Sequence, residues 1–188
     1  MVIRKGNCMD ISINNQEFLK ELNQFLGKAS RATYAGSGAE ITPERLGFRE
    51  LEYPEGNWYY RDSYTGWFRS WGTELVRYDG KPVWNALYGG GMEPECQKDV
   101  EFARMTFDFL KKALSAGEKQ EVFQPRGPKV FYDDDWQDWK YEADWIGDIT
   151  QFIGNERILC GLRDTPIGSR KVVFTHHFAG GLIIGKEL

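Results

Sequence analysis

Cysteine is scarce in this sequence, and no two cysteines lie close together. Cys8, Cys96 and Cys160 are odd in number and widely spaced, with no C-x-x-C motif. Proteins held by disulfides carry an even and dense set of cysteines, and zinc sites draw on closely spaced pairs. The sequence therefore excludes a disulfide framework and a zinc knuckle, and it favours a reducing, cytoplasmic location.

Histidine is scarcer still, and the short motifs of common enzyme classes are missing. His176 and His177 are the only histidines, so no H-x-x-H or H-E-x-x-H motif exists. The glycine-rich signatures of nucleotide-binding loops are absent, and so is the G-x-S-x-G elbow of serine hydrolases. We therefore expect no metal and no cofactor, and the motifs favour a protein that is not an enzyme.

Long apolar runs and clusters of positive charge are also lacking. No segment approaches the length of a membrane-spanning helix, and the N-terminus lacks the apolar core of a signal peptide. The net charge is −4, whereas a protein that neutralises phosphates gathers Lys and Arg. We therefore expect neither membrane nor direct nucleic-acid partners. Residues 1–14 are interpreted as an N-terminal extension, with Met9 as an alternative start to Met1.

Aromatic residues, by contrast, are abundant. Seven Trp, nine Tyr and twelve Phe make up 15% of the 188 residues, while apolar residues overall reach 41%. Each ring buries a large apolar area, so rings can compensate for a short aliphatic list. The length suits a single domain, 1–188, with a core filled largely by rings.

Two segments have the apolar spacing of amphipathic helices. Residues 16–29 place apolar side chains three to four positions apart, and Asn14 with Glu17 forms a capping pair. A second helix is expected to open at Glu93-Pro94-Glu95 and to end near Gly117. The apolar stripe of this second helix contains Val100, Ala103, Phe107, Leu110 and Leu114, widened by Phe102, Phe109 and Ala113.

The remaining pattern is typical of strands. Residues 47–92 are rich in aromatic and β-branched side chains, and Asp79-Gly80 is a strong hairpin signal. The triplet Gly89-Gly90-Gly91 is interpreted as a close backbone turn that ends this set. Strands resume at residues 139–184. Between the two sets, residues 118–138 predict a surface loop with an acidic hairpin or lid.

The two strand-rich stretches resemble each other. Two alignments support this resemblance. The first matches Tyr59-x-x-Asp62, Gly66 and Gly72-x-Glu74-x-Val76 to Tyr141-x-x-Asp144, Gly147 and Gly154-x-Glu156-x-Ile158. The second matches Val83–Met92 to Val173–Leu182. The second alignment has no gap and places Tyr88 against Phe178. Each stretch follows an amphipathic helix, so the first repeat spans residues 15–93 and the second spans 94–188.

This organisation predicts the fold class. We expect an α+β fold, an antiparallel sheet with two amphipathic helices, internally duplicated as a helix plus three or four strands, twice. Two units are too few for a solenoid, so a pseudo-twofold arrangement is more natural. Chance similarity between aromatic-rich strands is the alternative.

Glu74 and Glu156 hold equivalent places in the two aligned stretches. If the copies pack about a twofold axis, both carboxylates face a shared groove, where paired carboxylates perform acid/base work or hold a cation. The alternative is that each is an ordinary acid on a strand face. Asp62 and Asp144 lie at turn-like spacing before a glycine, and we interpret both as turn-making residues.

His176, Arg126 and a set of rings complete the candidates. Neighbours on a strand point to opposite faces, so His176 and His177 cannot ligate one metal from one side. His176 would instead line a pocket, or be a satisfied core or surface histidine. Arg126 lies in a stiff loop between two prolines, which suits an anion or a structural carboxylate equally. The candidate ligand-binding residues are Tyr59, Glu74, Trp84, Tyr88, Arg126, Tyr141, Glu156, Phe174, His176 and Phe178, with no catalytic and no metal-ligating residue.

Short stretches spread over most of the chain resemble a known family. They are Phe25–Ala35, Tyr60-x-Asp62-Ser-Tyr-Thr-Gly66, Gly72-Thr-Glu74, Gly80–Trp84, Tyr88-Gly89, Phe109–Leu114, Arg126-Gly-Pro128, Phe152–Glu156 and His177-Phe-Ala-Gly180-Gly181. This combination is similar to a bacterial and archaeal domain of unknown function, family number 5680. Some members of that family are attached to an XRE-type helix-turn-helix. The resemblance implies no activity, but a module carried by regulators implies a ligand sensor.

We therefore predict a small-molecule-binding or sensor-like module with a groove between the two repeats. Its aromatic and carboxylate lining favours a planar, cationic or hydroxylated ligand. Two alternatives stay open: a protein-interaction or oligomerisation module, with a homodimer as its simplest form, and a hydrolase that uses paired carboxylates.

Overall fold

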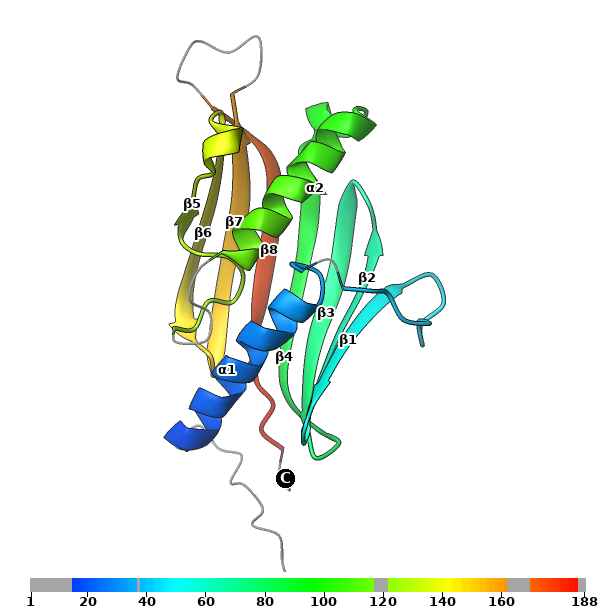
Figure 1. Ribbon diagram of the computed structural model, residues 1–188, viewed down its shortest axis with the longest axis vertical. Helices are drawn as coiled ribbons and strands as arrows, with labels where there is room; N and C mark the ends of the chain where they lie inside the picture. Colours follow the sequence, from blue (N-terminus) through cyan, green and yellow to red (C-terminus); the bar gives the residue numbers. More distant parts are fainter. Residues whose placement is uncertain (1–14, 37, 117–121, 162–169, 186–188) are drawn as a thin grey trace, which may run out of the picture.

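Eight strands form one antiparallel sheet, and two α-helices lie against the same face of it (Figure 1). In chain order the elements are α1 (Gln16–Ala32), β1 (Arg49–Glu55), β2 (Trp58–Gly66), β3 (Arg69–Tyr78), β4 (Lys81–Met92), the 3-10 turn η1 (Pro94–Cys96), α2 (Val100–Ser115), β5 (Val130–Phe131), the 3-10 turn η2 (Asp134–Trp136), β6 (Trp139–Asp148), β7 (Gln151–Cys160) and β8 (Lys171–Leu182). This computed structural model describes residues 15–36, 38–116, 122–161 and 170–185. The predicted α+β class, with an antiparallel sheet and two helices, is confirmed.

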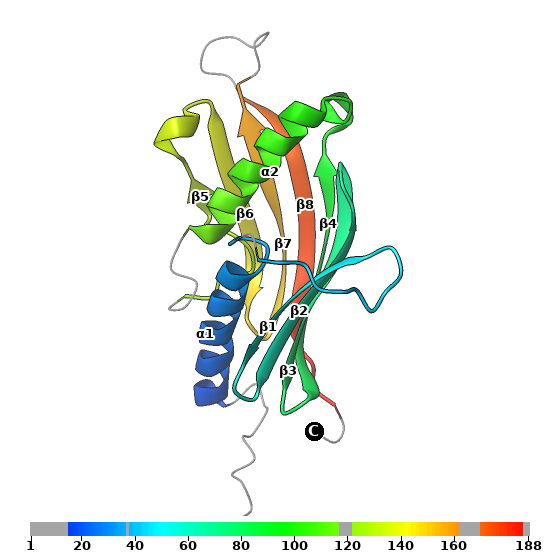
Figure 2. The ribbon, with the colours of Figure 1, turned by 45° about the vertical axis from the view of Figure 1, so that its right-hand side comes forward.

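The sheet consists of two meanders joined through their last strands. The strand order is β1-β2-β3-β4-β8-β7-β6-β5, so β4 and β8 form the central pair. Tyr88 of β4 lies directly opposite Phe178 of β8 in this pair. Figure 2 shows the sheet curving around the two helices. The helices therefore lie on the concave face of the sheet, and the side chains on this face point toward them.

The two helices begin at polar caps. The side chain of Asn15 accepts a hydrogen bond from the Phe18 amide at the start of α1, while Asn14 lies outside the described residues. The side chain of Asp99 accepts a hydrogen bond from the Phe102 amide, so α2 begins at Val100. The predicted start at residues 93–95 was wrong, because those residues open the separate turn η1. The predicted end at residue 117 lies outside the described residues.

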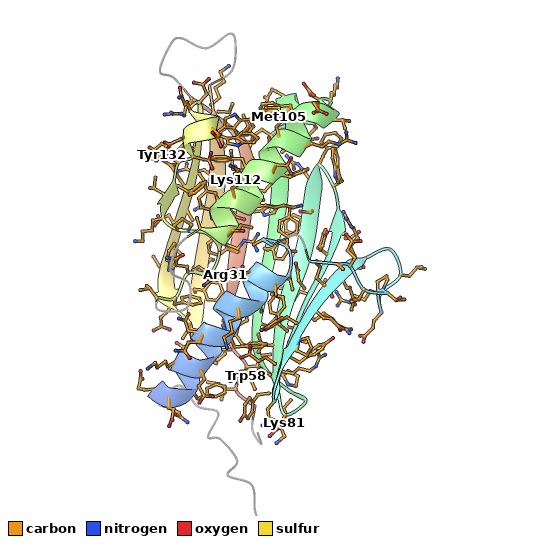
Figure 3. All side chains as sticks on the ribbon, in the orientation of Figure 1. Arg31, Trp58, Lys81, Met105, Lys112 and Tyr132 are labelled. Atoms are coloured by element: carbon orange, nitrogen blue, oxygen red, sulfur yellow. The ribbon has the colours of Figure 1, made fainter. Side chains whose placement is uncertain are left out.

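Each helix covers its own aromatic cluster on the sheet. The cluster under α1 centres on Phe18, Phe25 and Trp84 and draws mainly on β1–β4, with Phe152 and Phe178 from β7 and β8. The cluster under α2 centres on Phe109 and Phe174 and draws mainly on β6–β8. Figure 3 shows the side chains of the helices and the strands. The predicted ring-rich core is confirmed. Because the chain divides its core in two, the boundary between the clusters is where space can remain.

The glycine triplet and the connecting segments depart in part from the expectations. Asp79 and Gly80 both have positive φ, as a tight hairpin turn between β3 and β4 requires. Residues 89–91 do not form a turn; they lie inside β4. Within residues 118–138, the described part contains the short strand β5 and the turn η2, and Lys112 of α2 pairs with Asp133 at 2.8 Å. Residues 1–14 lie outside the described residues.

Neither α1 nor α2 is long and apolar enough to cross a membrane, and they are the α-helices of the part of the chain that the structure describes.

Candidate functional site

A cavity of about 490 Å³ lies between the helices and the concave face of the sheet. Its lining residues come from α1, α2, β1 to β4, β8 and the segment 123–126; those used below are Tyr34, Tyr60, Asp62, Tyr64, Ser70, Glu74, Trp84, Tyr88, Gln124, Arg126, Phe174 and His176. This volume is in the range of pockets that hold small molecules. The cavity occupies the boundary between the two aromatic clusters.

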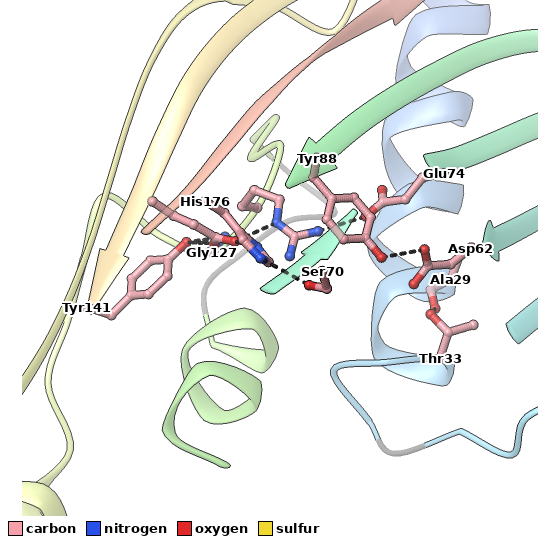
Figure 4. A network of polar contacts seen from close by, with 11 residues as sticks. Ala29, Thr33, Asp62, Ser70, Glu74, Tyr88, Gly127, Tyr141 and His176 are labelled. Carbon is pink, nitrogen blue, oxygen red and sulfur yellow. Dashed lines mark hydrogen bonds and ion pairs between the residues drawn. The ribbon is translucent and has the colours of Figure 1, made fainter. Parts of the chain in front are cut away.

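Gly72 gives Tyr88 the room to reach across the sheet. The two residues lie opposite each other on β3 and β4, and a Cβ atom at Gly72 would lie 2.4 Å from the Tyr88 hydroxyl. The tyrosine ring therefore crosses over β3, and its hydroxyl donates to the Asp62 carboxylate on β2 at 2.8 Å (Figure 4). A larger residue than glycine at position 72 would block this contact.

Gly90 likewise leaves room for a contact across a strand, here between Ser70 and His176. It lies between Ser70 of β3 and His176 of β8 in the strand register, with φ of 133°. A Cβ atom there would lie 2.2 Å from the Thr175 carbonyl oxygen. The close approach of β8 to β4 therefore requires glycine at position 90. With no side chain between them, the His176 Nε2 and Ser70 Oγ atoms lie 3.3 Å apart (Figure 4).

Arg126 joins the two glutamates singled out from the sequence. Its Nη1 atom lies 2.9 Å from Glu74 Oε1, and its Nε atom lies 3.0 Å from Glu156 Oε1. The guanidinium also stacks over the Tyr88 ring at 4.6 Å. The loop of Arg126 suggested either an anion or a structural carboxylate as its partner, and the described contacts are with structural carboxylates. The two glutamates therefore reach a common point, but through a shared cation.

Glu156 is fully buried and accepts hydrogen bonds from three side chains. Besides Arg126, these are the Tyr141 hydroxyl at 2.7 Å and His176 Nδ1 at 3.2 Å. Burial by itself would raise the pKa of this carboxyl, but Arg126, His176 and Tyr141 outweigh burial and lower the pKa to about 2. Glu156 is therefore ionised at any ordinary pH, as a structural carboxylate should be.

His176 is buried on the concave face, whereas His177 is exposed on the other face. Burial lowers the pKa of the His176 imidazole, against the opposing effect of Glu156, so the ring is neutral at neutral pH. The Glu156 carboxylate can only accept, which assigns the ring proton to Nδ1. The Nε2 atom is then an acceptor, and the Ser70 hydroxyl is the donor toward it.

Asp62 is the carboxylate with the opposite tendency. It is 2% exposed and lies directly opposite Glu74 in the register of β2 and β3. Burial and the neighbouring charge of Glu74 raise the pKa of Asp62 to about 7, although the hydrogen bond from Tyr88 and the charge of Arg126 act against this. Asp62 therefore changes its protonation state near neutral pH.

Gln124 contributes an unused acceptor to the same lining. Its Oε1 atom is buried and has no hydrogen-bond donor among the described residues. A buried amide oxygen without a partner costs free energy, roughly 1–3 kcal/mol, and such a group calls for a donor. A bound molecule or a water in the cavity would supply it.

The predicted site residues fall into three groups. Glu74, Trp84, Tyr88, Arg126, Phe174 and His176 line the cavity, and Tyr141 and Glu156 contact it from behind through hydrogen bonds. Phe178 packs in the core against Phe152 rather than on the cavity. Tyr59 lies away from the site, since its hydroxyl donates to Glu52 at 2.5 Å and accepts from Arg61.

The interpretation of Asp62 and Asp144 as turn residues was wrong. Both lie inside strands, Asp62 in β2 and Asp144 in β6. Their sequence alignment also fails in space, because Asp62 faces Glu74 while Ala143, not Asp144, faces Glu156. Asp144 is exposed. Both aspartates lie twelve residues before their glutamate, but three residues separate the last pair of β2 and β3, Gly66 and Ser70, and only two separate Asp148 from Gln151. The shorter connection shifts the register by one residue, which moves Asp144 to the other face of the sheet.

Among the polar residues of the lining, sequence reasoning missed Asp62, Ser70 and Gln124 as site residues. Alternation along residues 60–64 was a usable signal for the first, because Tyr60, Asp62 and Tyr64 share one face of β2. Ser70 has no local signal, since its importance depends on a glycine one strand away and a histidine two strands away. Gln124 has no local signal either.

Comparison with known proteins gives one match. Residues 62–183 match the model of a family described as "Domain of unknown function (DUF5680)", which covers more than half of the chain. No curated protein and no solved structure matches. The matched range includes Asp62, Ser70, Glu74, Arg126, Glu156 and His176.

Proposed function

Because the chain belongs to the DUF5680 family, whose description assigns no function, we propose one from the site: the domain binds a small molecule with a planar ring and a cationic group. The cavity between the helices and the sheet holds the ligand, and its cationic group lies beside Asp62. Such a role fits a sensor-like module. The attachment of some relatives to an XRE-type helix-turn-helix stays a prediction.

The charge at the floor of the cavity carries this proposal. Three carboxylates, those of Asp62, Glu74 and Glu156, surround one guanidinium, that of Arg126. Glu74 and Glu156 both pair with it, so Asp62 takes up a proton instead, with a pKa of about 7. A ligand ammonium or amidinium beside Asp62 would replace that proton. The floor therefore favours a cation over an anion.

The walls suit the rest of such a ligand. Rings from the turn after α1, from β2 and from β4 line the same cavity: Tyr34, Tyr60, Tyr64, Trp84 and Tyr88. A cation beside several aromatic faces gains about 0.5–2 kcal/mol per well-placed ring. Burial raises the pKa of Tyr60 and Tyr88 well above the usual value, so these hydroxyls stay neutral and are free of charge. The unused Oε1 acceptor of Gln124 adds a place for an N–H or O–H donor.

The solvent-accessible part of the cavity lining carries both signs of charge. It contains Arg49, Arg104 and Lys111 together with Glu40 and Asp108. This mixture neither repels nor attracts a simple cation strongly, so selectivity rests on the buried floor.

The test uses three ring compounds of equal size and different charge: benzylamine, benzyl alcohol and benzoate. We expect the amine to raise the melting temperature most and benzoate least. Amine binding near pH 7 should also release protons, because the cation lowers the pKa of Asp62; calorimetry in buffers of different ionisation enthalpy measures this. Asp62→Asn should weaken amine binding about tenfold or more, while exposed Asp144→Asn should leave it unchanged. Equal binding of amine and benzoate to the unaltered chain would contradict the proposal.

A second candidate function, self-association, has one specific observation in its favour. On the face of the sheet away from the helices, Leu87, Ile153 and Ile146 lie in adjacent positions of β4, β7 and β6, with Ala179 of β8 between the first two. Leu87, Ile153 and Ile146 are each more than half exposed. Sedimentation of the unaltered chain and of Ile153→Glu would test a homodimer through this row; a monomer at high concentration would refute it.

We also propose that the chain arose by internal duplication. The order helix plus four strands, met twice, supports this, and so does the direct pairing of Tyr88 with Phe178, the residues that the sequence alignment equates. Glu74 and Glu156 lie on corresponding strands of the two meanders. Aligning the two halves of further family members against each other tests the duplication, since chance similarity would not recur.

A further inference from the structure

Four residues lie in one row across the centre of the sheet. In the strand register, Ser70 of β3 faces Gly90 of β4, Gly90 faces His176 of β8, and His176 faces Glu156 of β7. Side chains of one row point to the same face, so only the glycine separates the serine from the histidine. The three polar groups then follow each other at 3.3 Å from Ser70 Oγ to His176 Nε2 and at 3.2 Å from His176 Nδ1 to Glu156 Oε1.

We propose that Ser70, His176 and Glu156 form a nucleophile–base–carboxylate relay and that the cavity hydrolyses carboxylic esters. This is the arrangement that activates a serine hydroxyl in unrelated folds, where it is recognised by geometry and roles rather than by sequence position. Ser70 lines the cavity and is not fully buried, so a substrate can reach its Oγ atom. Contacts of this length tighten when substrate binds.

The protonation states suit the relay. A general base must be unprotonated, and burial keeps the His176 imidazole neutral at neutral pH. The carboxylate must be ionised to hold the ring in the Nδ1–H form, and Glu156 is held ionised by Arg126 and Tyr141. Arg126 and Tyr141 also fix the position of Glu156, because each donates to it at 3.0 Å or less. The ring can therefore present only Nε2 to Ser70.

The reaction needs no reactant other than water. Ser70 Oγ forms a bond to the acyl carbon while its proton moves to His176 Nε2; the ester C–O bond then breaks, and the departing oxygen takes that proton. A water oxygen next attacks the acyl carbon and gives its proton to Nε2. The bond between Ser70 Oγ and the acyl carbon breaks, and Oγ recovers the proton. One ester and one water become one acid and one alcohol.

The charge of the floor narrows the substrate class. Three carboxylates against one guanidinium leave the site acidic, so an oxyanion at the acyl carbon gains little stabilisation. Esters with good leaving groups, such as aryl esters or thioesters, need this stabilisation least. We therefore expect the relay to act on these rather than on amides.

The relay does not depend on the cationic ligand proposed above. Asp62 and Ser70 lie on different strands, and the relay is complete without Asp62. The two ideas can fail separately: Asp62→Asn removes amine binding and leaves Ser70 reactive, and Ser70→Ala does the reverse.

The test is covalent labelling of the unaltered full chain with a fluorophosphonate, followed by peptide mass spectrometry. The hydroxyl displaces fluoride and stays bound to phosphorus, so we expect the adduct on Ser70. Ser70→Ala should lower labelling roughly a hundredfold. The control is Ser63→Ala, because Ser63 donates to Glu50 on the opposite face of the sheet at 2.9 Å and should not matter. No adduct, an adduct elsewhere, or equal labelling of Ser70→Ala would overturn the proposal.

A pH profile and an ester substrate separate catalysis from a merely structural role. With p-nitrophenyl acetate, the unaltered chain should release nitrophenolate in a burst that Ser70→Ala lacks. The labelling rate should rise with pH and level off below neutral, as His176 loses its proton. His176→Gln should abolish the rise; if this variant does not fold, the profile of the unaltered chain decides. A rate that climbs without a plateau to pH 9 would show simple hydroxide chemistry and refute the relay.

Discussion

The two meanders of the sheet each place one glutamate on the concave face, but they give it different neighbours. In β2–β3–β4, Glu74 lies between Asp62 and Ala86; in β6–β7–β8, Glu156 lies between Ala143 and His176. The second carboxylate accepts from three side chains and is held ionised. The first has a second acid beside it, Asp62, whose pKa is raised to about 7 by burial and by the charge of Glu74.

This difference indicates which carboxylate supports the fold and which one can change its protonation state. A carboxylate saturated with donors is part of the framework, and replacing it should cost stability. Asp62 and Glu74, by contrast, are neighbouring acids near a guanidinium that Glu156 also binds, so their protonation can change. Replacing Asp62 should therefore alter ligand binding and titration rather than stability. The paired-carboxylate hydrolase that the sequence left open thus loses its free pair, because Arg126 bridges Glu74 and Glu156.

The largest expected effect is the loss of the charge at Glu156. Glu156→Gln leaves the buried guanidinium of Arg126 with one carboxylate and should lower the free energy of unfolding by about 3–5 kcal/mol. Glu74→Gln should cost clearly less, because Glu74 lines the cavity and is partly accessible. Urea unfolding of both variants measures the difference. Equal losses would mean that the two halves hold their acids in the same way.

A smaller effect is expected from filling the space under Tyr88. Gly72→Ala places a Cβ atom 2.4 Å from the tyrosine hydroxyl and should destabilise the fold by about 1–3 kcal/mol. It should also break the contact from Tyr88 to Asp62. Gly161→Ala is the control, because a Cβ atom there would make only ordinary contacts, 3.5 Å from Asp138. If Gly72→Ala leaves amine binding intact, the ring is not what positions Asp62.

The third prediction contrasts the two halves by pH. Asp62 has a raised pKa in the folded chain, so its contribution to stability is full below about pH 4 and is lost as the pH rises through about 7. Glu156 has a lowered pKa, so its contribution is full above about pH 4.5 and is lost as the pH falls toward 2. Urea unfolding at several pH values should show both slopes. Asp62→Asn should remove only the upper one.

The smallest effect concerns the hydrogen bond between Tyr88 and Asp62. This bond lowers the pKa of Asp62, so Tyr88→Phe should raise that pKa above 7, as carbon-13 NMR of the carboxyl can follow. Removing this one hydrogen bond should cost about 0.5–1.5 kcal/mol, less than the change at Gly72. A downward shift would contradict the assigned direction of donation.

Periodicity was enough to find the elements but not their contacts. The stripe of α1 and the hairpin at Asp79-Gly80 follow from local rules, and both were predicted. The start of α2 was missed because a proline at residue 94 and an aspartate at residue 99 both signal a helix start, and only the second caps α2. Local patterns rank such signals poorly, since tertiary packing decides between them.

The site itself depends on neighbours across strands, which no single stretch of sequence reveals. Glu74, Glu156 and Arg126 were found as separate candidates, but the cation that joins them spans two halves of the chain. Gly72 and Gly90 act through the space they leave for Tyr88 and His176. A glycine in a strand has several explanations, and only the register of β3, β4 and β8 shows which one applies here.

The central pairing of β4 with β8 has a consequence for how the chain folds. Within each meander, partner strands are neighbours in sequence and can zip up early; Tyr88 and Phe178, by contrast, are 90 residues apart and close a very long loop. Joining them is therefore the slow event, and local hairpins should gain protection from hydrogen exchange first. Arg126, bonded to both sides, can find its partners only after that seam has closed.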